Sequence, residues 1–165
     1  MVGFSKSRPI MGTLTKPNVG TERITVRPAT AGDLQHIKHH FGVLDTIGDP
    51  FCDVTKIQNV RLDWMIVAEV DRKYAGFLYW HSGENPFFAT EITKFAHIRE
   101  IQVLDRFQRR GVGKELIRHA LSKLRVLGIH DVFLSTTESN AVARHLYESF
   151  GFSPFRTQIQ YSLRH

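Results

Sequence analysis

Cysteine is scarce in this sequence, with Cys52 as the single example among 165 residues. One cysteine excludes an intramolecular disulfide and a zinc site built from several cysteines, and it is typical of a reducing compartment such as the cytoplasm. No apolar run approaches the roughly 18 residues of a transmembrane helix, so we expect no membrane partner. With 42% hydrophobic and 23% charged residues, a chain of this length is expected to form one globular domain.

Acidic residues are absent from the first 21 positions, which carry Lys6, Arg8 and Lys16 among Gly, Pro, Ser and Thr. This composition predicts a flexible basic tail over residues 1–21, followed by a domain over residues 22–165. The tail lacks the continuous apolar stretch of a secretory signal, and its shortage of acid leaves a mitochondrial transit peptide as an alternative.

Alternating and helical patterns of apolar residues predict a mixed α/β domain after residue 22. Strands are expected at 24–27, 64–70, 74–80, 96–103, 131–136 and 157–163. Helices are expected to start after Thr30, after the loop at 108–113 and after Ser139-Asn140, and to end at Gly42, Gly128 and Gly151. Residues 43–63 are ambiguous, and residues 82–94 are expected to form a loop.

A glycine loop, Gln108-Arg109-Arg110-Gly111-Val112-Gly113, separates the predicted strand 96–103 from a long amphipathic helix. Backbone N–H groups and the positive end of a helix dipole meet at such a junction, which makes it an anion site. Two arginines and the following Lys114 add positive charge. The dinucleotide-binding pattern needs a glycine where this chain has Leu116, and the Walker pattern needs Ser or Thr where it has Glu115.

This loop resembles the Q/R-x-x-G-x-G/A acetyl-CoA loop of the GNAT superfamily of N-acetyltransferases. Three more segments resemble the superfamily in the same order: Glu100-Ile101-Gln102-Val103, Ser139-Asn140 and Leu146-Tyr147-Glu148-Ser149-Phe150-Gly151-Phe152. The likeness covers about 140 residues. It implies one α/β domain whose mostly antiparallel sheet has six to seven strands, with strands four and five splayed apart and about four flanking helices.

The resemblance also implies that acetyl-CoA is the cosubstrate, with no metal. Backbone groups of the loop would hold the pyrophosphate, and the pantetheine arm would bond the backbone of Ile101 and Val103 between the splayed strands. Asn140 would bond the same arm, or act as a helix N-cap, or do both. The expected cofactor-binding residues are therefore Ile101, Val103, Gln108, Arg109, Arg110, Gly111, Val112, Gly113, Lys114 and Asn140.

The chemistry implied by the resemblance is direct attack of a neutral amine on the acetyl thioester in a ternary complex, which gives Cys52 no role as a nucleophile. Glu100 would accept the amine proton, usually through water. Alternatively, Glu100 is a strand glutamate that pairs with a neighbouring cation such as Arg99. His97 and His81 are reserve bases.

Tyr147 matches the tyrosine that donates a proton to the departing thiolate in this superfamily. The unperturbed phenol pKa of about 10 suits a donor at neutral pH. Its alternative role is that of an aromatic core residue at helical spacing from Val142 and Phe150.

The acceptor is expected to be a peptide or protein amine, or a small cationic amine, bound by residues 43–63 and 82–94. Acidic residues in these segments could receive a cation or cap solvated turns: Asp45, Asp49, Asp53, Glu84 and Glu91. Phe87 and Phe88 could line an apolar slot or pack over the sheet. His36, His39 and His40 come together on one helix face, but nothing nearby supplies further metal ligands.

The net charge of +6 is concentrated in the tail and in residues 105–118, which carry five basic and two acidic side chains. A nucleic-acid binder would be basic more widely and would carry an aromatic-studded basic stripe, so no nucleic-acid partner is expected. The chain is expected to act as a monomer or homodimer. A non-catalytic module that binds or senses acyl-CoA is the alternative function, and it would have no need of Glu100 and Tyr147.

Overall fold

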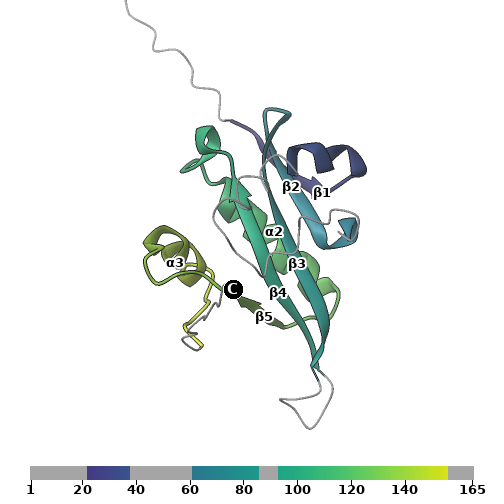
Figure 1. The fold of residues 1–165 in the computed structure, drawn as a ribbon, viewed down its shortest axis with the longest axis vertical. Helices are drawn as coiled ribbons and strands as arrows, with labels where there is room; N and C mark the ends of the chain where they lie inside the picture. The colour runs from purple at the N-terminus through teal and green to yellow at the C-terminus, as the bar shows by residue number, and fades with distance from the viewer. Residues whose placement is uncertain (1–21, 38–60, 86–92, 156–165) are drawn as a thin grey trace, which may run out of the picture.

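The computed structural model describes residues 22–37, 61–85 and 93–155. Five strands form one sheet in the order β1-β2-β3-β4-β5 (Figure 1). Antiparallel pairing joins β1 through β4, whereas β4 and β5 are parallel. The strands are β1 (Ile24–Pro28), β2 (Met65–Val70), β3 (Lys73–Asn85), β4 (Thr93–Val103) and β5 (Asp131–Leu134). The mixed, mostly antiparallel sheet predicted from the sequence is therefore confirmed.

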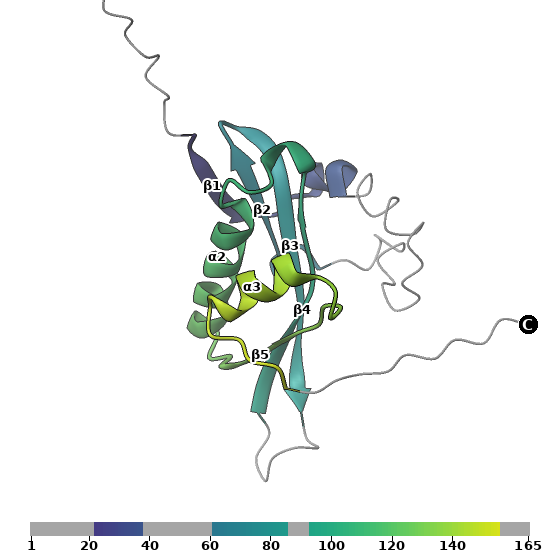
Figure 2. The ribbon, with the colours of Figure 1, turned by 90° about the vertical axis from the view of Figure 1, so that its left-hand side faces the viewer.

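Helix α2 (Val112–Val126) covers one face of the sheet (Figure 2), and Leu146 of α3 (Ala141–Glu148) lies near Gly113 in the first turn of α2. The apolar face of α2 is fully buried against the sheet at Leu116, Ile117 and Leu124. Gly128 follows the helix with φ of 72°, the left-handed conformation expected of a terminating glycine. Leu127 is the C-cap residue that follows the helix, and its side chain is 49% exposed. No helix among the described residues is long and apolar enough to cross a membrane.

The opposite face of the sheet carries a second, smaller core. Met65, Val67 and Phe77 point into it and meet Ile37 from the helical turn that follows β1. This turn begins with the 3-10 helix η1 (Ala31–Asp33), and Figure 2 shows it on the side of the sheet away from α2. The sheet is thus covered on both faces, as a single α/β domain requires.

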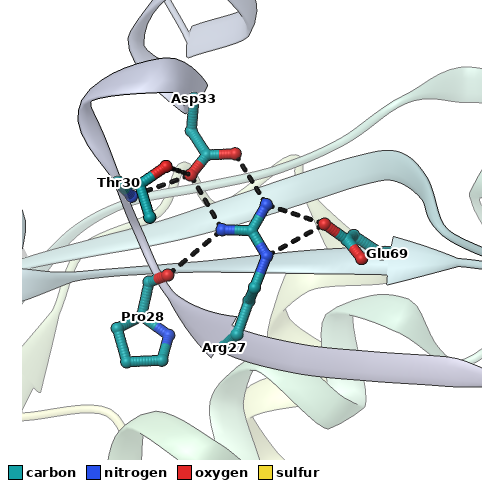
Figure 3. Close-up of polar contacts among 5 residues, drawn as sticks. All are labelled: Arg27, Pro28, Thr30, Asp33 and Glu69. Atoms are coloured by element: carbon teal, nitrogen blue, oxygen red, sulfur yellow. Dashed lines mark hydrogen bonds and ion pairs between the residues drawn. The ribbon is translucent and has the colours of Figure 1, made fainter.

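A polar cluster made by Arg27, Thr30, Asp33 and Glu69 fastens η1 to the first two strands (Figure 3). The two terminal nitrogens of Arg27 donate to the two carboxylate oxygens of Asp33, each at 2.8 Å. Arg27 Nε and Nη2 also donate to Glu69 Oε1, at 2.9 and 2.7 Å. The sequence predicted the Thr30 cap with its carboxylate three residues on, but not the arginine that joins them to β2.

The two ends of the loop expected at residues 82–94 belong to strands instead, since β3 runs to Asn85 and β4 starts at Thr93. Ser82 pairs with Ala96, and Glu84 pairs with Lys94. Gly83 suggested a loop, yet it lies where a Cβ would meet the Phe95 ring at 3.3 Å. A glycine inside a strand at such a close approach breaks the alternating pattern that signals a strand.

The prediction of six to seven strands and about four helices is not confirmed. The described residues supply five strands, and the strand expected at 157–163 lies outside them. The first predicted helix is described only as far as Ile37. The basic tail over residues 1–21 also lies outside the described ranges.

The resemblance implied that strands four and five splay apart, and in the structure β4 and β5 pair over only a few residues. These strands pair only from Phe95 with Asp131 to Ile98 with Leu134. Strand β4 then continues to Val103, where it pairs with β3 alone. Beyond Ile98, one edge of β4 is therefore not used by β5.

Candidate active site

The loop between β4 and α2 contains two residues in the left-handed region. Arg109 has φ of 60°, and Gly111, the residue before the helix, has φ of 86°. A glycine adopts this conformation without the clash that a Cβ creates, so Gly111 is needed for the shape of the loop itself. The 3-10 helix η5 (Asp105–Phe107) connects the loop to the end of β4.

Gly113 lies where three elements come together. A Cβ on Gly113 would lie 3.4 Å from Leu146 Cδ2 and 3.9 Å from Val103 Cγ2. The start of α2, the end of β4 and the middle of α3 therefore meet at this glycine. The predicted binding residues Val103 and Gly113 thus lie together with α3, which carries Tyr147.

The first turn of α2 presents unpaired helix amides, as the anion-site prediction requires. The N–H of Glu115 donates to Gly111 O at 3.0 Å. The amides of Val112, Gly113 and Lys114 come before Glu115 in the first turn, where backbone N–H groups have no carbonyl partner within the helix. The Val112 side chain is buried, and only its backbone can meet a ligand. The side chains of Arg109 and Lys114 are exposed next to these amides.

Two of the predicted cofactor-binding side chains already have protein partners. Arg110 Nη1 donates to Glu22 Oε1 at 2.6 Å, which ties the loop to the residues before β1. Gln108 Nε2 donates to Val103 O at 3.1 Å and to Asp105 Oδ1 at 2.8 Å. Gln108 therefore holds the loop against β4. It also donates a hydrogen bond to the carbonyl of Val103, a residue whose backbone was expected to bond pantetheine.

The strand edge expected to receive the pantetheine arm is nevertheless present. The N–H of Leu104 donates to Ala75 O of the β3 segment at 2.9 Å. In a strand, the N–H and C=O of one residue point to the same edge, and those of the next residue point to the other edge. Because Leu104 points toward β3, the N–H and C=O groups of Val103 and Ile101 point away from it. They face the side on which the β4–β5 ladder has ended, while their side chains pack against the core.

Glu100 of β4 and Tyr147 of α3 lie close enough to interact electrostatically. Burial raises the pKa of Tyr147 above its ordinary value, and the negative charge of Glu100 raises it further. Both side chains are half-buried. The Tyr147 ring also packs edge-on against Phe152, with ring centroids 6.2 Å apart. The structure thus brings together the two residues predicted to be catalytic.

The reserve base His97 is in a poor position to accept a proton. Its Nδ1 lies 3.4 Å from Arg99 Nη1, and a guanidinium can only donate, so the lone pair of Nδ1 is directed at Arg99. Burial lowers the pKa of His97, and the charges of Arg99 and His81 lower it further. His81 pairs with His97 across the strands and packs edge-on against Trp64 at 5.1 Å.

Asn140 acts as the N-cap of α3, because its Oδ1 accepts from the N–H of Ala143 at 3.1 Å. The N-cap interpretation is confirmed. The Oδ1 is used by the cap, so a contact to pantetheine would come from Nδ2, and that contact stays a prediction.

Most of the predicted acceptor-binding residues lie outside the described ranges: Asp45, Asp49, Asp53, Phe87, Phe88 and Glu91, together with His39, His40 and Cys52. Glu84 is exposed and lies opposite Lys94. His36 stacks on Tyr74 with ring centroids 4.8 Å apart. Among the residues described, no group of three or more His, Cys, Asp or Glu side chains could hold a metal ion.

The sequence is similar to curated N-acetyltransferases. A ribosomal protein bS18-alanine N-acetyltransferase of Salmonella typhimurium is 45% identical over 47 residues, covering 28% of this chain and 32% of the relative. The enzyme of the same name from Escherichia coli (strain K12) is 32% identical over 83 residues, covering 49% and 56%. The chain therefore spans about a third and just over half of the lengths of these relatives.

The fold is shared with solved acetyltransferase structures. Aminoglycoside N-acetyltransferase AAC(6')-Iy in complex with CoA has a TM-score of 0.68 and 20% identity, covering 89% of this chain and 99% of that one. The family model described as Acetyltransferase (GNAT) family matches residues 42–152, well over half of the sequence. This chain belongs to the GNAT family of acetyltransferases.

Proposed function

We propose that this chain moves an acetyl group from acetyl-CoA to a primary amine by direct attack in a ternary complex. The observation that carries the proposal is that Glu100, on β4 just beyond the end of the β4–β5 ladder, is within electrostatic range of Tyr147 on α3. The start of α2 lies beside it through the contact of Gly113 with Val103 and Leu146. These contacts support a site in which Glu100 acts as the base, Tyr147 as the hydrogen-bond donor and the start of α2 as the anion site.

The described residues fit acetyl-CoA as the acetyl donor. The amides of Val112, Gly113 and Lys114, with the charges of Arg109 and Lys114, would hold the pyrophosphate. The peptide groups of Ile101 and the N–H of Val103 would bond the pantetheine arm. The peptide groups of Ile101 and Val103 lie on the edge of β4 that β5 leaves after Ile98, so a pantetheine arm bound there would bring the thioester toward Glu100 of the same strand.

The amine must lose its proton before it can attack. At pH 7 this needs about 1.4 kcal/mol for an α-amine with a pKa of about 8, and about 4.6 kcal/mol for a lysine-like amine with a pKa of about 10.4. We assign the acceptance of this proton to Glu100, directly or through water. The contact between His97 and Arg99 makes His97 the weaker candidate for this role.

Tyr147 remains protonated at neutral pH because burial and Glu100 both raise its pKa. A thiol such as that of cysteine has a pKa of about 8.5, well below that of this phenol. Tyr147 therefore stabilises the departing sulfur mainly by donating a hydrogen bond. In the balanced reaction the new C–N bond replaces the C–S bond, and the proton lost by the amine matches the one gained by the thiol.

The test is incubation of the full chain with acetyl-CoA and a panel of amines, with release of free thiol as the readout. Turnover with at least one amine is expected, and calorimetry should show acetyl-CoA binding. A chain that binds acetyl-CoA tightly but acetylates no amine would instead support the non-catalytic acyl-CoA-binding module. In that case the catalytic roles of Glu100 and Tyr147 would be wrong.

A further inference from the structure

Gln108 ties the glycine loop to the end of β4 with its side-chain amide. Its Nε2 donates to Val103 O at 3.1 Å and to Asp105 Oδ1 at 2.8 Å. A primary amide has two N–H donors, so these partners use both of them. The backbone N–H of Gln108 also donates to Asp105 O at 3.1 Å. Three hydrogen bonds therefore fix this residue between the last residue of β4 and the 3-10 helix η5.

The two partners of this side chain restrict the residue types that can replace Gln108. A backbone carbonyl and an ionised carboxylate can only accept hydrogen bonds. The position therefore needs a long side chain with at least two N–H donors. Glutamine and arginine both meet this need, and they are the two residue types that begin the Q/R-x-x-G-x-G/A pattern that this loop resembles. The contacts of Gln108 thus give a reason for this choice that requires no contact with a ligand.

The residue after Gln108 has a strained backbone conformation. Arg109 has φ of 60°, in the left-handed region that a residue with a Cβ adopts at a cost. Such a conformation persists where the surrounding contacts determine it. Gln108 fixes the chain before Arg109, and the ion pair of Arg110 with Glu22 fixes the chain after it. The course of the loop is therefore set by its ties to the end of β4 and to the residues before β1.

Val103 connects this tie to the proposed cofactor site. Its carbonyl accepts from Gln108, whereas its N–H, on the same edge of β4, is assigned to the pantetheine arm. The pyrophosphate is assigned to the amides at the start of α2, which begins at Val112. Gln108 therefore lies on the connection between the two halves of the site, and its hydrogen bonds set their separation.

We propose that Gln108 is a positioning residue that sets the spacing between the pantetheine half and the pyrophosphate half of the acetyl-CoA site. The inference rests on the proposed function, and it assigns the Gln108 side chain a role through Val103 and Asp105 instead of a contact with the cofactor. A ligand that occupies two linked subsites gains affinity when the spacing of the subsites matches its length. Without the tie, each half would still bind its own part of the cofactor, but the whole cofactor would bind more weakly.

The test compares the unmodified chain with Gln108→Leu, which removes both donors and keeps a side chain of similar size. Calorimetry measures the affinity for CoA, and NMR titration measures the weaker affinities for two fragments of it, ADP and pantetheine. The CoA affinity should fall by about tenfold, comparable to the loss of one or two hydrogen bonds, whereas each fragment affinity should change by less than about twofold. The ratio of CoA affinity to ADP affinity therefore reports the spacing.

Two further variants serve as controls. Gln108→Arg supplies N–H donors again and should restore the ratio. The charge that it adds strengthens the binding of CoA and ADP alike, so the charge cancels in the ratio. Gln35→Leu makes the same substitution as Gln108→Leu at an exposed residue of the helical turn after β1 and should leave the ratio unchanged. Urea unfolding shows that each variant is folded.

An unchanged ratio in Gln108→Leu would overturn the inference. Equal losses of affinity for CoA and ADP would show that Gln108 serves phosphate binding alone, and a gain in CoA affinity would show that it blocks the strand edge, so both results contradict the inference. If the unmodified chain binds no CoA, the proposed function and the inference both fail. If it binds CoA but acetylates no amine, the proposed transfer fails, and the affinity ratio still decides the inference.

Discussion

Asp33 is a charged side chain that is only 5% exposed, and its charge is compensated by specific partners. Arg27 binds both of its oxygens, and the N–H and hydroxyl of Thr30 donate to Oδ2 at 2.7 Å each. The hydrogen bonds from Arg27 hold the pKa of Asp33 well below its usual range, although burial opposes this. A buried charge is tolerated when it is paired in this way, and removal of one partner leaves the other uncompensated.

We expect Asp33→Asn to destabilise the fold by about 2 kcal/mol, below the value of about 3 to 5 kcal/mol typical of fully buried pairs, because solvent screens the Arg27 side of the contact. Urea unfolding measures this change. The matched control is Asp63→Asn, because the Asp63–Arg61 ion pair is exposed on both sides and its loss should change stability little. Equal effects of the two substitutions would contradict this role of Asp33.

Glu100→Gln should lower the pKa of Tyr147, because it removes the negative charge that helps to raise it. Phenolate absorbance against pH measures the shift, with Tyr147→Phe identifying which transition belongs to this residue. The same substitution should reduce kcat/KM at neutral pH by about a hundredfold or more, the usual contribution of a general base. Activity should recover as pH rises toward the pKa of the amine, and a Tyr147 pKa unaffected by Glu100→Gln would argue against their proximity.

Single residues also show how far sequence reasoning reaches. Glu100, Tyr147 and Asn140 were identified from local motifs, and the structure brings the first two together and confirms the third as a cap. The pairing of Arg110 with Glu22 could not be predicted, since it depends on the end of one strand lying beside a distant loop. The irregular pairing between β3 and β4 at Arg99 has no signal in the sequence, because it depends on how the two strands meet.

At the scale of elements, the strand, glycine loop and helix around residues 96–126 were well predicted. Three signals agreed there: apolar residues typical of a strand, a glycine loop and a long amphipathic helix. The extension of β3 and β4 into residues 81–85 and 93–95 was missed. This part of the sequence carries polar residues and a glycine, so it lacks the apolar alternation that predicts a strand. The extension is stabilised by pairing between β3 and β4 rather than by buried side chains.

Gly111→Asp should weaken acetyl-CoA binding strongly, because it adds a negative charge and a Cβ at the start of α2. Gly128→Asp is the matched control, since Gly128 also has a positive φ but follows the other end of α2, with no atom within 4 Å of a built Cβ. Both substitutions should cost about 1 kcal/mol or more of stability from backbone strain. Calorimetric titration should show lost affinity only for Gly111→Asp, and equal affinities would reject the anion site.

At the scale of the whole molecule, the order of the described elements agrees with the prediction, and the sheet is covered on both faces. The cluster around Asp33 joins the turn after β1 to β2, so its protonation should affect global unfolding. Which distant segments meet could be predicted only through resemblance to a family, because contacts such as that of Gly113 with Leu146 leave no local pattern.

Stability toward acid should depend on Asp33. Because the pKa of Asp33 is lowered in the folded chain, its contribution is fully present above the unfolded value of about 3.9 and is lost as pH falls below it. The difference in unfolding free energy between the unmodified chain and Asp33→Asn should therefore be constant above about pH 5 and shrink at lower pH. Urea titrations across this range provide the measurement, and a difference independent of pH would contradict it.

The end of the β4–β5 ladder also bears on association between chains. An exposed strand edge ordinarily invites pairing with another copy and leads to aggregation. Here two helices lie close to the end of the β4 edge that β5 leaves, because Val103 and Leu146 of α3 are both near Gly113 at the start of α2. We therefore expect the two helices to hinder pairing of Ile101 and Val103 with a strand of a second copy, while a single extended ligand needs less space beside β4.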